Sequence, residues 1–146
     1  MSKRTLILKA LAEKLKLIDG TGIFKTNISN NSYPKLKFWD EVQDFPCIYL
    51  TPGTETRDYH PSGFTWAYLL ICIKCYVKSE DQTQENLELL LDDIERCVDA
   101  NRVLVYDQDN NLETTEILVQ SITTDEGLLT PYGVGEIYLQ VRYAHN

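Results

Sequence analysis

The chain has 146 residues, of which 43% are apolar and 25% charged, the proportions of an ordinary globular protein. Its 22 acidic and 14 basic side chains give a net charge of −8, which argues against specific nucleic-acid binding because phosphate contacts need a basic surface. No stretch approaches the roughly 18 consecutive apolar residues of a membrane span, and the charged N-terminus does not resemble a signal peptide. We therefore expect a single domain, residues 1–146, that is made in a cytoplasm and contacts no membrane.

Residues 3–18 are predicted to form an amphipathic helix. Its aliphatic side chains recur at helical spacing, and they are Ile7, Leu8, Leu11, Leu15 and Ile18. Five basic residues against one acidic residue give residues 1–18 a charge of +4, so the outer face is basic. Such a helix can pack on a core or lie on a membrane surface. The stripe has no aromatic anchor, which favours core packing.

Residues 22–29 are predicted to form a short strand, followed by a polar loop that ends at Pro34. Residues 47–50 are a short buried strand that ends at Thr51-Pro52-Gly53. The next stretch, 54–60, alternates polar and charged residues and is too polar for a core. This arm is either a solvated loop or a surface that binds a partner, and its candidate contact residues are Glu55, Arg57, Asp58 and Tyr59.

The stretch 63–79, GFTWAYLLICIKCYVKS, is the longest apolar and β-branched run and is predicted to be the central strand. Side chains of a strand alternate between its two faces. One face is entirely apolar and consists of Ala67, Leu69, Ile71, Ile73, Cys75 and Val77. The other changes from aromatic to basic along the strand. The first face is therefore predicted to pack against the helices.

Residues 81–100 are predicted to form a second helix, with Ser79 and Gln82 at the spacing of a capping box and Asn101 as a left-handed C-terminal cap. Leucines, Ile94 and Val98 repeat at intervals of three and four. Eight acidic residues against one arginine give residues 80–99 a charge of −7. The two predicted helices therefore carry opposite charges.

Three strands are predicted after the second helix, at 103–106, 113–123 and 134–143. The loop before the last strand contains Leu128 and Leu129, which either fold back onto the domain or make a contact with a partner. The predicted fold class is α+β, with a largely antiparallel sheet and two helices packed on one face.

No catalytic, cofactor-binding or metal-binding set emerges from the sequence. Cys72 and Cys75 form a C-x-x-C, but three residues apart on a strand they point to opposite faces, too far apart for a disulfide or a shared zinc. His60 and His145 have no nucleophile at a motif spacing. The chain is therefore predicted not to be an enzyme and to need no cofactor.

The order of the segments resembles the tail terminator, or tail completion, proteins of long-tailed bacteriophages. The resembling features are the N-terminal helix with its Leu-x-x-x-Leu stripe, the strand FPCIYLTPGTE, the long strand AYLLICIKCYVKS before the acidic helix ENLELLLDDIERCV, and the closing TTDEG…PYGVGEIYLQVRY. The match spans most of the chain in order and spacing. The Asn-rich stretch around residues 27–32 departs from it.

The resemblance implies a virion protein at the head-proximal end of the tail. Its copies would assemble into a ring, typically a hexamer, that caps the tail tube, stops tube polymerisation and offers the surface to which the head joins. The implied partners are further copies of the chain, the tail tube protein and a neck or head–tail connector protein. Alternatives are another neck or head–tail joining component and, from a different class, a small cytosolic ligand-binding domain or enzyme.

The charge pattern adds a hypothesis about how such copies would meet. The basic helix, with Lys9, Lys14 and Lys16, or the arm with Arg57, would face acidic surface on the next subunit. The same charges can instead pair within one subunit.

Overall fold

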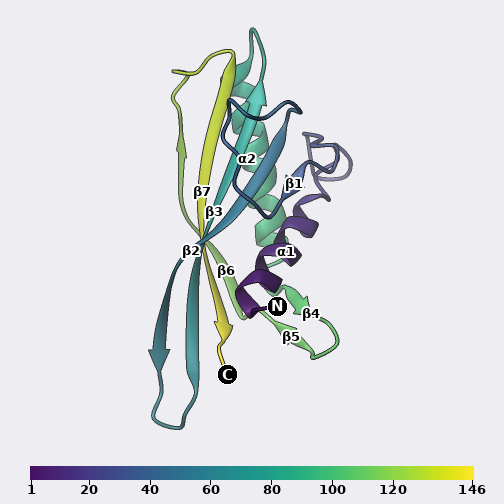
Figure 1. Cartoon of the computed structure of the whole chain (residues 1–146). Coiled ribbons are helices and arrows are strands. Elements are labelled where there is room, and N and C mark those ends of the chain that lie inside the picture. The colour runs from purple at the N-terminus through teal and green to yellow at the C-terminus, as the bar shows by residue number, and fades with distance from the viewer.

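The computed structural model describes residues 1–146 and has an α+β architecture, as the sequence predicts. Two helices lie on one face of a five-stranded sheet with strand order β1-β2-β3-β7-β6 (Figure 1). Neighbouring strands are antiparallel, except for the parallel pair β1 and β2. β4 and β5 form a separate hairpin. The elements are α1 (Lys3–Leu15), β1 (Ser32–Tyr33), β2 (Cys47–Tyr59), β3 (Thr65–Lys78), α2 (Thr83–Ala100), β4 (Val105–Asp107), β5 (Leu112–Glu113), β6 (Glu116–Thr124) and β7 (Tyr132–Ala144).

β3 is the centre of the sheet, paired with β2 on one side and β7 on the other. The face predicted to be apolar is buried, and from Ala67 to Cys75 each of its side chains has no accessible surface. β7 alternates in the same way. Its buried side chains are Ile137, Leu139, Val141 and Tyr143. The two strands together form the centre of the surface that the helices cover.

The helices divide this surface between them. α1 packs against β1, β2 and β4, whereas α2 packs against β3, β7 and β6. Their apolar stripes join the strands in one core, to which Ile18 also belongs although α1 ends before it. α1 and α2 meet where the Cys97 thiol contacts the Lys14 carbonyl oxygen at 3.4 Å. The two helices therefore lie toward opposite edges of the sheet.

Two glycines of β7 allow α2 to approach the sheet closely. A Cβ atom at Gly133 would lie 2.7 Å from Val77 Cγ2, and one at Gly135 would lie 2.9 Å from both Cys75 Sγ and Leu91 Cδ2. These separations are shorter than carbon and sulfur atoms tolerate. α2 therefore packs directly against the backbone of Gly133 and Gly135 in β7.

The polar arm is part of a strand, so the predicted strand end at Thr51-Pro52-Gly53 is wrong. β2 continues to Tyr59, with a register shift between Pro52 and Glu55, and pairs with β3 as far as Thr65. Polar residues adopt this extended conformation because β3 supplies an antiparallel partner. The hairpin projects well beyond the helices (Figure 1).

The strand predicted at 22–29 is also wrong, apart from one bridge between Asp19 and Asn27. The segment is instead fixed to α2 by Asp93, whose buried carboxylate accepts hydrogen bonds from the backbone nitrogens of Lys25 and Thr26 and from the Thr26 hydroxyl. These bonds satisfy backbone donors that a strand would have placed in a sheet.

Several element ends differ from their predicted positions. α2 begins at Thr83 without a side-chain cap, and Ser79 Oγ accepts a bond from Gln82 N ahead of the helix. Asn101 has φ −129° rather than a left-handed value, and its amide donates to the Cys97 carbonyl. The predicted strand 113–123 is divided between β5 and β6. Neither helix has the length and apolar character needed to cross a membrane.

Candidate interaction surfaces

The hairpin arm contains an ion pair formed within the subunit. The side chain of Glu55 is only 5% exposed, and its carboxylate accepts hydrogen bonds from the Tyr143 hydroxyl and from Arg57 Nε at 2.7 Å. Burial by itself raises the pKa of this carboxyl. The bonds from Tyr143 and Arg57, with the charges of Arg57 and Arg4, outweigh it and lower the pKa. Glu55 is thus engaged inside its own subunit, whereas Arg57, Asp58 and Tyr59 are exposed.

The C-terminal residues lie along this arm, and Lys3 at the start of α1 holds them in place. Lys3 Nζ donates to the carbonyl oxygens of Ala144 and His145 at 3.2 and 3.0 Å. A ring nitrogen of His145 lies 3.0 Å from Arg57 Nη1, and the Asn146 side chain accepts a bond from Thr65 N. The arm is therefore braced by the C-terminal residues rather than joined to the sheet by its two strands alone.

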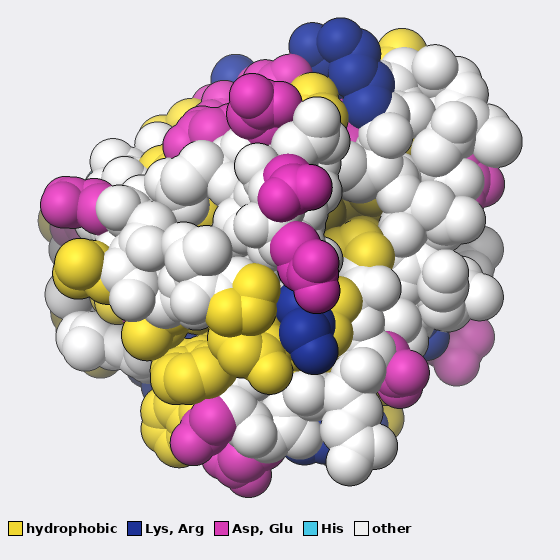
Figure 2. Space-filling view, turned by 90° about the horizontal axis from the view of Figure 1, so that it is seen from above, with side chains coloured by type: hydrophobic (Ala, Val, Ile, Leu, Met, Phe, Trp, Pro, Cys, Tyr) yellow, Lys and Arg dark blue, Asp and Glu magenta, His cyan; other side chains and the backbone are white.

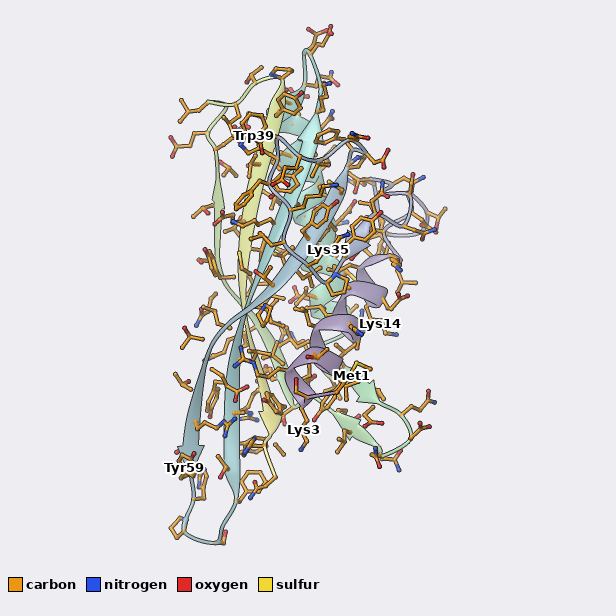
Figure 3. All side chains as sticks on the ribbon, in the orientation of Figure 1. Met1, Lys3, Lys14, Lys35, Trp39 and Tyr59 are labelled. Atoms are coloured by element: carbon orange, nitrogen blue, oxygen red, sulfur yellow. The ribbon has the colours of Figure 1, made fainter.

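The lysines of α1 do not form one cluster. Lys9 is exposed and contacts no carboxylate, while Lys16 has Glu13 at 2.8 Å. Lys14 lies on the β4 flank, where it helps to line a cavity of about 450 Å³. A further lysine, Lys35 (Figure 3), has its ammonium 5.5 Å from the Tyr33 ring, which packs with the small cluster on the face of the sheet away from the helices. Lys35 is therefore separate from the basic face of α1.

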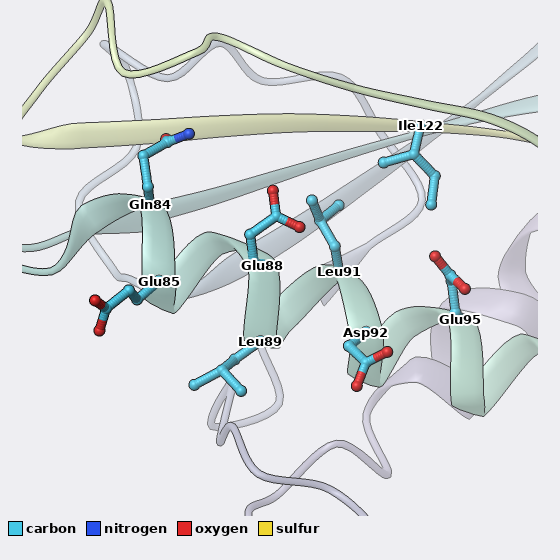
Figure 4. Close-up of a pocket in the computed structure, with 8 residues that line it drawn as sticks. All are labelled: Gln84, Glu85, Glu88, Leu89, Leu91, Asp92, Glu95 and Ile122. Carbon is cyan, nitrogen blue, oxygen red and sulfur yellow. The ribbon is translucent and has the colours of Figure 1, made fainter.

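The outer face of α2 borders a groove of about 690 Å³ that also reaches β6. Its lining residues are Gln84, Glu85, Glu88, Leu89, Leu91, Asp92, Glu95 and Ile122. In Figure 4, Gln84, Glu88, Leu91 and Glu95 rise from α2 toward the strands, where Ile122 points back at them. The groove therefore combines an apolar floor with carboxylates.

The carboxylates of this groove repel one another. Of its four acidic residues only Asp92 has a cationic partner, Arg96 at 3.0 Å. Burial raises the pKa of Glu95, and the negative charges of Asp92, Asp99 and Glu88 raise it further. No ion pair joins α1 to α2, so the opposite charges of the two helices are not paired within the subunit.

The loop between β6 and β7 is exposed at its tip. Leu128 is 85% exposed and does not fold back onto the domain, while Leu129 is half-buried. The same end of the molecule shows a group of hydrophobic side chains around one basic side chain (Figure 2). Trp39 and Phe45 pack there against Tyr132 with tilted rings, and Lys78 lies 5.2 Å from the Tyr132 ring.

Three of the four cysteines are buried. All four cysteines are free, and burial raises the pKa of Cys47 to about 12, so this thiol stays protonated. Cys75 lies in the core, and Cys72 is on the opposite face. His60 pairs with Asp58 at 3.3 Å on the exposed arm. No group of three or more His, Cys, Asp or Glu side chains is arranged to hold a metal ion.

Comparison with known proteins identifies the kind of protein that carries these surfaces. A family model described as "Bacteriophage Tail Tube Terminator Protein" matches residues 1–146. The chain belongs to this family. A similar relative of this terminator is the tail tube terminator protein p142 of Escherichia phage T5, 37% identical over 98% of this chain and 94% of p142. The resemblance found in the sequence is thus confirmed, and the chain is a component of a phage tail.

A solved structure shares the fold of this terminator. A chain from the virion of a native gene transfer agent particle matches with a TM-score of 0.61, covering 94% of each chain at 10% sequence identity. At that identity the match concerns the fold alone. It agrees with the α+β architecture described above.

Two parts of the terminator's surface were not found from the sequence. The sequence did not indicate an exposed position for Lys35, because the surrounding residues form an irregular loop without periodicity. The groove depends on Ile122 of β6 lying beside α2, which is a contact between distant segments. The sequence predicted residues 113–123 only as a strand, and a register shift between Val119 and Ser121 is what turns Ile122 toward the helix-covered face.

Proposed function

We propose that this terminator forms a closed ring, a hexamer, at the head-proximal end of the tail. The ring caps the finished tail tube, ends tube polymerisation and provides the surface to which the head joins. Its partners are further copies of the chain, the tail tube protein and a neck or head–tail connector protein. Assembly takes place in the host cytoplasm, and the protein acts as a structural component and not as an enzyme.

The observation that carries this proposal is the family match over residues 1–146, which assigns the chain to the tail tube terminator family. The shape of the subunit supports it. A ring needs a heterologous interface, in which one side of a subunit meets a different side of the next. The two helices place opposite charges toward opposite edges of the sheet, as such an interface requires.

The proposal is tested first by native mass spectrometry of the purified protein across a concentration series, with negative-stain images of the same sample. We expect hexamers with a central hole, either free or after addition of tail tubes from particles that lack the protein. Subunits that stay monomeric under both conditions would contradict the ring.

The second test separates termination from head joining. Particles assembled without the protein should contain tails of uncontrolled length, because nothing stops the tube from growing. Tails of normal length with detached heads would instead identify a head–tail joining component. A saturable small-molecule ligand in a thermal-shift screen would favour a ligand-binding domain.

A further inference from the structure

The groove between α2 and β6 has three features of a docking surface. It is open along one flank of the subunit and has the apolar side chains Leu89, Leu91 and Ile122 among its carboxylates. It borders β6, an edge strand of the sheet whose backbone is unpaired on its outer side. From Ile117 to Thr124 this strand carries no charge, and Leu118 and Ile122 are 40% and 37% exposed. The flank is therefore a template for a neighbouring chain.

The groove also lacks cationic partners for most of its carboxylates. Glu85, Glu88 and Glu95 have no cationic partner, so an isolated subunit carries the cost of their mutual repulsion. Gln84, at one end of the groove, has a buried carbonyl oxygen, Oε1, that accepts no hydrogen bond. A rotation of this amide would present the acceptor to a donor. Both observations favour an occupant that brings positive charge and hydrogen-bond donors.

Two lysines on the opposite flank of the subunit have the same spacing as two glutamates of the groove. Lys9 and Lys16 of the α1 segment are seven residues, or about 10 Å, apart along the helix axis. Glu88 and Glu95 of α2 are also seven residues apart, so the two pairs have the same spacing and each lies on one side of its helix. Lys9 has no carboxylate partner, and Lys16 has only Glu13 from the same helix.

The positions of the helices allow this contact to repeat. α1 lies toward the β1–β2 edge and α2 toward the β6 edge. A subunit that offers its acidic groove on one flank therefore offers its basic helix on the opposite flank. Repetition of one contact between opposite flanks produces a heterologous interface, which closes into a ring when the rotation permits.

We propose that the acidic groove of one subunit receives the basic outer face of α1 from a second copy, with Lys9 and Lys16 opposite Glu88 and Glu95. This inference rests on the ring of the proposed function and names its contact. Lys14 is not part of the contact, because it lies on the β4 flank of α1.

The test compares ring formation by charge-reversed full-length chains, in solution and on tail tubes, at low salt where exposed charges are least screened. One variant carries Lys9→Glu and Lys16→Glu, and another carries Glu88→Lys and Glu95→Lys. Each alone should lose rings because like charges then face each other. An equimolar mixture of the two should regain them as alternating rings, and a chain that carries all four changes should regain them as uniform rings.

A matched control carries Lys14→Glu and Lys35→Glu, which change the net charge by as much as the lysine pair but lie elsewhere on the surface. It should assemble like the wild type. Circular dichroism and thermal melting of every variant establish that it is folded.

Each other outcome overturns the proposal. Rings formed normally by both reversed variants would remove the contact while leaving the terminator ring intact. Loss of rings without recovery in the mixture or the fourfold variant would show that these side chains do not face each other. Normal rings from the glutamate-reversed chain that no longer attach to tubes would assign the groove to the tail tube protein. Absence of rings from the wild type under all conditions would contradict the proposed function as well.

Discussion

The contact between α2 and β7 depends on the absence of a side chain at Gly135. An added Cβ there would lie 2.9 Å from Cys75 Sγ and Leu91 Cδ2 and 3.3 Å from Leu87 Cδ1. Cys75 and Leu87 are completely buried, so neither has free space into which to move. The substitution Gly135→Ala should therefore push α2 away from the sheet, and with it the helix that forms the acidic groove.

The size of the effect follows from two opposing contributions. Overpacking a well-packed core costs about 1–3 kcal/mol. The loss of backbone freedom in the unfolded chain returns about 0.4–1 kcal/mol when glycine becomes alanine. We expect a net loss of about 1–2 kcal/mol, which lowers the Tm by about 2–8 °C in a chain of this size. Urea unfolding should show a lower Cm with an unchanged slope, because the surface exposed on unfolding is nearly the same.

Gly53→Ala is the matched control. Its φ is not positive, and a Cβ there would meet nothing closer than the Leu70 carbonyl oxygen at 3.3 Å, on the face of β3 away from the helices. It should destabilise the protein less than Gly135→Ala. A Gly135→Ala variant that melts at or above the wild-type temperature would refute the conclusion that the glycines of β7 determine how closely α2 packs.

Two further predictions concern buried carboxylates. Tyr143→Phe removes a hydrogen-bond donor to the Glu55 carboxylate. The pKa of Glu55 is lowered in the folded state, so the ionised carboxylate stabilises the fold at neutral pH. This stabilisation is lost as the pH falls through the lowered pKa. The variant should be less stable by about 1.5–3 kcal/mol at pH 7, and the difference from the wild type should shrink in acid; a difference that is independent of pH would contradict this role of Glu55. Asp93→Ala removes the acceptor of the Lys25 and Thr26 amide hydrogens. By hydrogen–deuterium exchange these amides should exchange with solvent faster than in the wild type, while amides in β3 keep their protection. Unchanged rates at both positions would show that Asp93 does not hold this segment.

The sequence by itself determined those elements in which one buried face makes the apolar side chains recur at a regular spacing. The alternation in 63–79 predicted β3 with the correct buried face, and 134–143 was predicted as a strand, because each of these strands has one face in the core along its length. The helical stripes predicted α1 and α2 for the same reason. The opposite charges of the two helices were also evident, since charge is a property of composition and needs no partner.

The tertiary structure decided whatever depends on a partner from elsewhere in the chain. Residues 54–59 have no apolar periodicity, yet they form a strand because β3 pairs with them. Residues 22–29 have strand-like composition, yet Asp93 takes their backbone donors. Helical spacing already puts Lys14 on a different side of α1 from Lys9 and Lys16, but only the fold places β4 beside it. Local patterns record which face of an element is buried, whereas pairing and surface assembly are set by contacts between distant segments, which leave no periodic pattern in the sequence.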